Sequence, residues 1–118
     1  MTPAVTVIAV LFLGMGLVAL VKPAFVGTFF DVRFDSVDGR NEVRAVYGGF
    51  GVAMCVVLVV ALREPALRDG VLVCAAVALL GMVGGRVVAA LLDGRPGLLP
   101  WLFCGVEIVL ALVLLAAR

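Results

Sequence analysis

The stretch VLVCAAVALLGMVGGRVVAALL, residues 71–92, decides the fold class of this chain. It is apolar except for Arg86, and its length matches the roughly 20 residues that cross a hydrocarbon core about 30 Å thick. Its apolar side chains do not alternate with polar ones, as they do along the strands of a membrane barrel. A helix satisfies its backbone hydrogen bonds within the segment. We therefore predict a transmembrane helix here.

Three further stretches have the same character. Residues 1–21 and 45–62 carry no charged side chain, and residues 98–117 carry only Glu107. The chain of 118 residues is 65% hydrophobic and 14% charged, with a mean hydropathy of +1.32. This composition excludes a water-soluble enzyme, a disordered chain and a nucleic-acid-binding protein. We predict one all-α domain over residues 1–118, an integral membrane four-helix bundle with spans at about residues 3–21, 43–62, 71–92 and 98–117.

A long connection, from Lys22 to Asn41, joins the first two predicted spans. Residues 30–34 alternate apolar and charged side chains, which is typical of a short strand. Phe25, Phe29 and Val32 also fit one face of an interfacial helix. Because the segment is rich in phenylalanine, we expect a partly ordered loop over the mouth of the bundle.

The other two connections, residues 63–70 and 93–97, are predicted to be short loops. Asp38–Gly39 and Asp93–Gly94 are typical turn pairs, and Asn41 is a favourable N-cap for the second span. Four spans joined in this way place both termini on one side of the membrane.

The basic loop residues give the expected orientation. The side with the termini carries Arg63, Arg68 and Arg118. The side with the long loop carries Lys22, Arg33, Arg40, Arg44 and Arg95. A raw count would put the long loop in the cytoplasm. The arginines at 33, 40 and 44 lie among acidic residues, however, and without them the count favours cytoplasmic termini. We expect a multi-pass protein of the bacterial inner (plasma) membrane with cytoplasmic termini.

Two charged residues lie inside predicted spans, and such residues usually face the bundle interior and have a partner. Arg86 precedes Asp93 by seven residues, which puts it about 10 Å below that end of its helix. Glu107 follows Leu98 by nine residues, about 13 Å below the same end. The two spans are antiparallel about a short turn, so we predict a buried Arg86–Glu107 ion pair.

More polar groups point to the same half of the membrane. Arg44, Tyr47, Gly48, Gly51 and Cys55 share a helical face on the second span. The other half of the bundle contains no buried charge, which indicates a vestibule open to one leaflet. The predicted ligand-binding residues are Glu42, Arg44, Tyr47, Arg86, Asp93 and Glu107.

The structural alternative is that Arg86 and Glu107 only fix the helix register, since apolar replacements of buried pairs often do as well. Glycines also indicate close helix contacts. Gly81 and Gly85 have GxxxG spacing, and Gly48 and Gly51 form a second cluster. We expect these faces to pack the second span against the third or, alternatively, to form a homo-oligomer.

Metal, redox and catalytic sites are poorly supported by this sequence. Cys55, Cys74 and Cys104 lie in three different spans, with no CxxC motif, and the chain has no histidine. We interpret the cysteines as small packing residues and expect neither a metal nor another cofactor. We favour a protein that is not an enzyme, because an enzyme would require Glu107 or Tyr47 as its catalytic acid or base.

The run NEVRAVYGG, residues 41–49, resembles the N-E-x-R-A-x-Y-G-G signature of a bacterial family of small four-helix membrane proteins described as a domain of unknown function. Gly85–Arg86, Asp93–Gly94 with Pro96, and Glu107 fit the same pattern in the same order. The resemblance covers nearly the whole chain. It implies the four-helix fold and the importance of these polar positions, but no activity. The architecture is also similar to that of the DoxX-like membrane proteins.

Three functional hypotheses follow from these residues. The first is a membrane protein that binds a membrane lipid or a small anionic amphiphile, with Arg44 and Arg86 as cationic anchors, because arginine suits carboxylate and phosphate groups. The second is a dimeric transporter like the small multidrug-resistance proteins, with Glu107 exchanging protons. Arg86 beside Glu107 favours the charged carboxylate and argues against that exchange. The third is an accessory or assembly subunit of a membrane complex.

Overall fold

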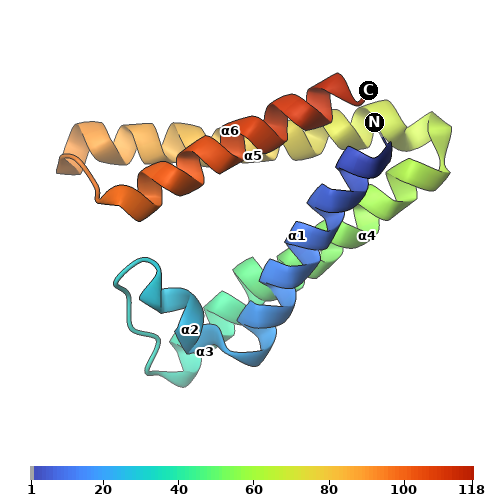
Figure 1. Cartoon of the computed structure of the whole chain (residues 1–118). Helices are drawn as coiled ribbons and strands as arrows, with labels where there is room; N and C mark the ends of the chain where they lie inside the picture. Colours follow the sequence, from blue (N-terminus) through green and yellow to red (C-terminus); the bar gives the residue numbers. More distant parts are fainter. Residues whose placement is uncertain (1) are drawn as a thin grey trace. The chain divides into compact units, whose positions relative to one another are not determined.

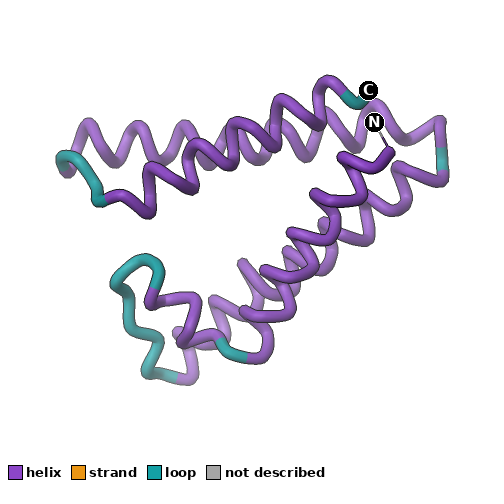
Figure 2. The backbone as a smooth tube through the Cα atoms, in the orientation of Figure 1, coloured by secondary structure: helices purple, strands orange, loops and turns teal. Residues whose placement is uncertain are grey.

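The computed structural model describes residues 2–118, and within this range the chain contains helices and short connections but no strand. Figures 1 and 2 show the helices along the chain. The elements are α1 (Thr2–Val21), α2 (Pro23–Thr28), α3 (Val37–Val43), the π-helix η1 (Arg44–Gly49), α4 (Phe50–Arg63), α5 (Pro65–Asp93) and α6 (Leu98–Ala116).

Four helical stretches are long and apolar enough to cross a membrane. They are α1, the continuous stretch Val37–Arg63 formed by α3, η1 and α4, then α5, and α6. The predicted all-α membrane architecture is therefore confirmed. The described chain divides into two compact units, residues 6–60 and residues 2–5 with 61–118.

In the unit of residues 6–60, α1 runs antiparallel beside η1 and α4 (Figure 1). Glycines bring the two backbones close together. A Cβ atom on Gly16 would lie 2.7 Å from the carbonyl oxygen of Gly48, and one on Gly51 would lie 2.8 Å from the carbonyl oxygen of Phe12. Small residues allow such close approach between helices in lipid. The predicted close contact at Gly48 and Gly51 is confirmed, but the third span as their partner is wrong, because these glycines lie against α1.

The second span begins earlier than predicted. Ser36 is the N-cap of α3, and its hydroxyl accepts a hydrogen bond from the backbone N–H of Gly39 at 2.9 Å. Asp38 lies in the first turn, where a negative charge is favourable at the helix N-terminus. The predictions of a turn at Asp38–Gly39 and of an N-cap at Asn41 are therefore wrong, because Ser36 starts the helix upstream of both.

The long connection between the first two spans is ordered, as predicted, but contains no strand. Pro23 begins the short helix α2, which favours the helical alternative for this segment. Beyond α2, the side chain of Phe34 packs with Phe30 and Tyr47 against a buried cluster. The cluster consists of Ala19, Val26 and Val43. The strand alternative for residues 30–34 is wrong. Phe30 and Phe34 pack against this cluster instead, and no strand lies among the described residues.

In the unit that contains residues 61–118, α5 and α6 form an antiparallel hairpin (Figure 2). The residues between them are 94–97, and Gly94 has a φ of +92°, a conformation that favours glycine. The predicted loop at residues 63–70 is wrong, because α5 already begins at Pro65. The Arg68 side chain donates to the carbonyl oxygens of Ala61 and Leu62, both at 3.2 Å, and so caps the last turn of α4.

The contact between α1 and α4 is tested by adding one methyl group. Gly16→Ala should lower the stability of the unit by about 1–3 kcal/mol, because the new Cβ meets backbone atoms that must move. Gly14→Ala on the same helix is the matched control, since its Cβ would have no atom within 4 Å. The measurement is thermal unfolding in detergent. Equal melting temperatures for the two variants would contradict the packing described above.

Candidate functional site

Arg86 on α5 and Glu107 on α6 form the predicted ion pair. Nη2 of Arg86 donates to Oε1 of Glu107 at 2.7 Å, and Nε donates to Oε2 at 2.9 Å. Nε also lies 3.2 Å from Oε1. This is the two-pronged geometry in which a planar guanidinium matches a carboxylate. The prediction of an Arg86–Glu107 pair is therefore confirmed.

The two partners differ in exposure. The Glu107 side chain retains 8% of its accessible surface, whereas the Arg86 side chain retains 22%. Both carboxylate oxygens accept hydrogen bonds from Arg86. The carboxylate is thus covered and bonded, and the Arg86 side chain is the more exposed member of the pair.

An aromatic ring on α6 also holds the arginine. The guanidinium carbon of Arg86 lies 5.9 Å from the centre of the Phe103 ring, within the range of a cation–π contact. Phe103 precedes Glu107 by one helical turn, so α6 presents the ring and the carboxylate on one face. Sequence reasoning missed Phe103, although its spacing of four residues from Glu107 was a usable signal.

Arg44 serves the fold through one of its nitrogens. Its Nε donates to the carbonyl oxygen of Leu20 at 2.8 Å, in the last turn of α1. The carbonyls of a last turn lack partners within the helix, and a cation is favourable there. Among residues 2–118 no hydrogen bond or ion pair is recorded for the two terminal nitrogens of Arg44.

The other predicted site residues have different surroundings. Tyr47 packs against Ala19 and its apolar neighbours. Glu42 and Asp93 are exposed, and no hydrogen bond or ion pair is recorded for either side chain within the described chain. The structure thus brings together Arg86 and Glu107, in the unit that also holds Asp93. Glu42, Arg44 and Tyr47 belong to the other unit. A common vestibule stays a prediction.

The face of the second span that carries Arg44, Tyr47, Gly48 and Gly51 is turned towards α1. Residues 44–49 form a π-helix, whose turns are wider than those of an α-helix. Gly48 lies against the Leu20 side chain, where a Cβ atom would be 2.8 Å from it. Single-turn π-helices are frequent at functional sites, so this segment is of interest beyond its packing.

The structure contains other candidate features. A cavity of about 90 Å³ is lined by Arg68, Ala61 and Ala117, among others, and so lies at the C-terminal end of α6. Cys55, Cys74 and Cys104 are free thiols. Among residues 2–118, no three His, Cys, Asp or Glu side chains come together as metal ligands.

A family model described as Domain of unknown function (DUF4345) matches residues 1–118. The chain belongs to this family. Searches of the curated proteins and of the solved structures found no match. The family is one of unknown function. The described part of this DUF4345 chain has four helices that suit a multi-pass membrane protein. The ion pair within those helices is the local feature from which a function can be argued.

The ion pair is tested by removing one partner and then both. Arg86→Leu should destabilise the protein by about 3–5 kcal/mol, because it leaves the Glu107 carboxylate buried without its partner. The double variant Arg86→Leu/Glu107→Leu should regain most of that loss. Unfolding free energies in mixed micelles give the comparison, with the exposed Arg95→Leu as the matched control. A double variant as unstable as the single one would contradict this account.

Proposed function

We propose that this chain is a membrane protein that binds a small amphiphile with an anionic or polar headgroup, anchored at Arg86. The observation that carries the proposal is the charged pair inside two apolar helices, in which the Glu107 side chain is covered and the Arg86 side chain is partly exposed. Ionisable residues within membrane helices are costly, and they commonly mark binding sites or transport pathways. The hydrophobic tail of the ligand would lie in lipid beside the apolar helices.

In this proposal Arg86 and Glu107 have different roles. Glu107 holds Nε and Nη2 of Arg86, and Phe103 lies against the guanidinium, so the arginine is fixed in one orientation. A fixed guanidinium loses less side-chain entropy when a headgroup binds. Arginine then recognises a carboxylate or phosphate through its planar donors. In this proposal Glu107 positions the anchor and does not itself contact the ligand.

Asp93 has a secondary role in this proposal. It ends α5, in the unit that also holds Arg86 and Glu107. We place it at the polar entrance through which the headgroup approaches Arg86. The protein would then sit in the plasma membrane of a bacterium with its termini in the cytoplasm.

A charge-swapped variant separates ligand binding from helix register. In Arg86→Glu/Glu107→Arg the two charges still attract each other, so the variant should keep its fold. It should lose at least about tenfold of the co-purified amphiphile, because the cation now lies at the covered position on α6. Native mass spectrometry of detergent-purified protein measures bound molecules, and melting temperature measures folding.

The control for this experiment is Arg118→Gln. Arg118 follows Glu107 by eleven residues, about 16 Å along α6, and its recorded hydrogen bond is to the carbonyl oxygen of Leu115. This variant should keep the bound amphiphile. The proposal is overturned if the charge-swapped variant retains the amphiphile, or if the wild-type protein carries only lipids in the proportions of the surrounding membrane.

A further inference from the structure

The segment after the first span has two different faces. Pro23, Val26 and Gly27 of α2 are buried. Phe25 and Phe29 are 49% and 38% exposed, and their rings meet edge to face with centroids 5.1 Å apart. The two rings therefore lie together on the exposed side of this segment, opposite its buried residues.

The depth of α2 can be read from its buried side. Val26 packs with Ala19, in the last turns of α1, and with Val43, one residue before Arg44. Arg44 in turn bonds to the carbonyl oxygen of Leu20. The short helix α2 therefore lies beside the end of the first span, at the level where that apolar helix leaves the membrane.

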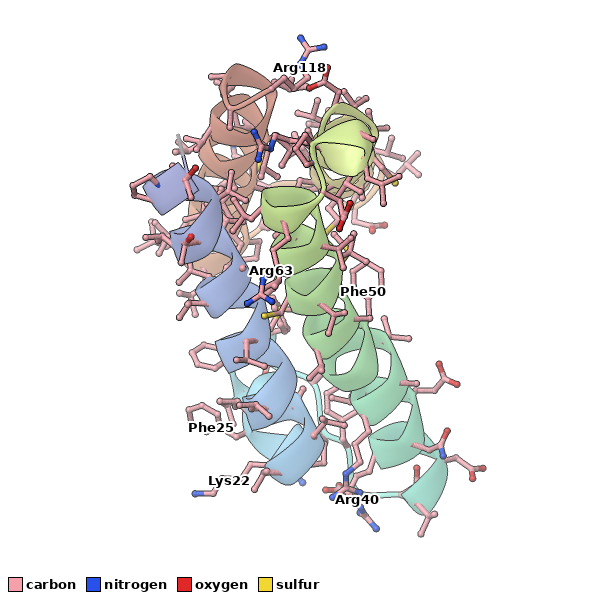
Figure 3. All side chains as sticks on the ribbon, turned by 90° about the vertical axis from the view of Figure 1, so that its right-hand side faces the viewer. Lys22, Phe25, Arg40, Phe50, Arg63 and Arg118 are labelled. Atoms are coloured by element: carbon pink, nitrogen blue, oxygen red, sulfur yellow. The ribbon has the colours of Figure 1, made fainter. Side chains whose placement is uncertain are left out.

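The position of Lys22 agrees with this depth of α2 at the end of the first span. Lys22 directly follows α1 and is exposed, and its backbone N–H still donates to the carbonyl oxygen of Val18 at 2.7 Å. Figure 3 shows Lys22 and Phe25 at the same end of the unit of residues 6–60. A lysine at the end of a membrane helix extends its ammonium to the headgroups while its stem stays in the apolar region.

We propose that Phe25, Phe29 and Lys22 form an interfacial anchor that binds the phospholipid surface. The two rings enter the boundary between headgroups and acyl chains, and the ammonium of Lys22 lies at the phosphates. Aromatic and basic residues on a short helix in the membrane plane are typical of such contacts. The buried cluster beneath α2 holds the anchor rigidly against α1 and α3. The anchor belongs to the unit of residues 6–60 and does not depend on the ligand proposed at Arg86.

The proposal places Phe25 in lipid but Val37 in water. Val37 is 74% exposed and begins α3, six residues before Val43, so it lies about 9 Å beyond the level of α2. This difference in depth provides a matched control on the same connection.

A single-tryptophan experiment tests the anchor. The one native tryptophan is removed by Trp101→Phe, and Phe25→Trp or Val37→Trp is then introduced. Each protein is reconstituted into phosphatidylcholine vesicles that contain lipids brominated near the carbonyl end of the acyl chain. The tryptophan at position 25 should be quenched at least threefold more strongly by the brominated lipid than that at position 37. Aqueous iodide should give the opposite order.

Each other outcome overturns the proposal. If position 25 is quenched by iodide as strongly as position 37, the segment faces water. If neither quencher reaches position 25, protein covers the segment. Phe29→Trp in the same background repeats the test on the other ring, should Phe25→Trp fail to fold by circular dichroism.

Discussion

At three helix ends of this chain, arginine side chains donate hydrogen bonds to backbone carbonyls of the last turn. The last turn of a helix leaves carbonyls without intrahelical partners, and a cation is favourable beside them. Arg44 donates to Leu20 at the end of α1, and Arg68 donates to Ala61 and Leu62 at the end of α4. Arg118 donates to Leu115 near the end of α6. At these three ends, an arginine from outside the last turn supplies what water supplies in a soluble protein.

Arg86 lies outside this pattern. It sits within α5, and its recorded hydrogen bonds go to a carboxylate on another helix and not to the end of a helix. Charged residues inside membrane helices commonly mark binding sites or transport pathways, and the headgroup recognition proposed above would account for this one.

The sequence predicted the features that follow from local composition and helix geometry. Four apolar runs fixed the spans, and a short turn fixed the relative depth of Arg86 and Glu107, so the ion pair followed from helical rise. Helix ends were predicted less well. The hydroxyl of Ser36 started α3 before the expected cap at Asn41, and Pro65 started α5 directly after Glu64. In both cases a local capping or conformational preference extended the helix beyond the apolar stretch.

Features that depend on a partner helix could not be predicted from the sequence. The glycines at 48 and 51 indicate close approach, but nothing in their spacing says that Gly16 and Leu20 of α1 receive them. A search for the α-helical period also cannot detect the π-helix at residues 44–49. The exposure of the two ion-pair partners could not be predicted from the sequence either. The Glu107 side chain is covered more than that of Arg86, because the exposure of each side chain is set by the helices packed around it and not by its own position in the sequence.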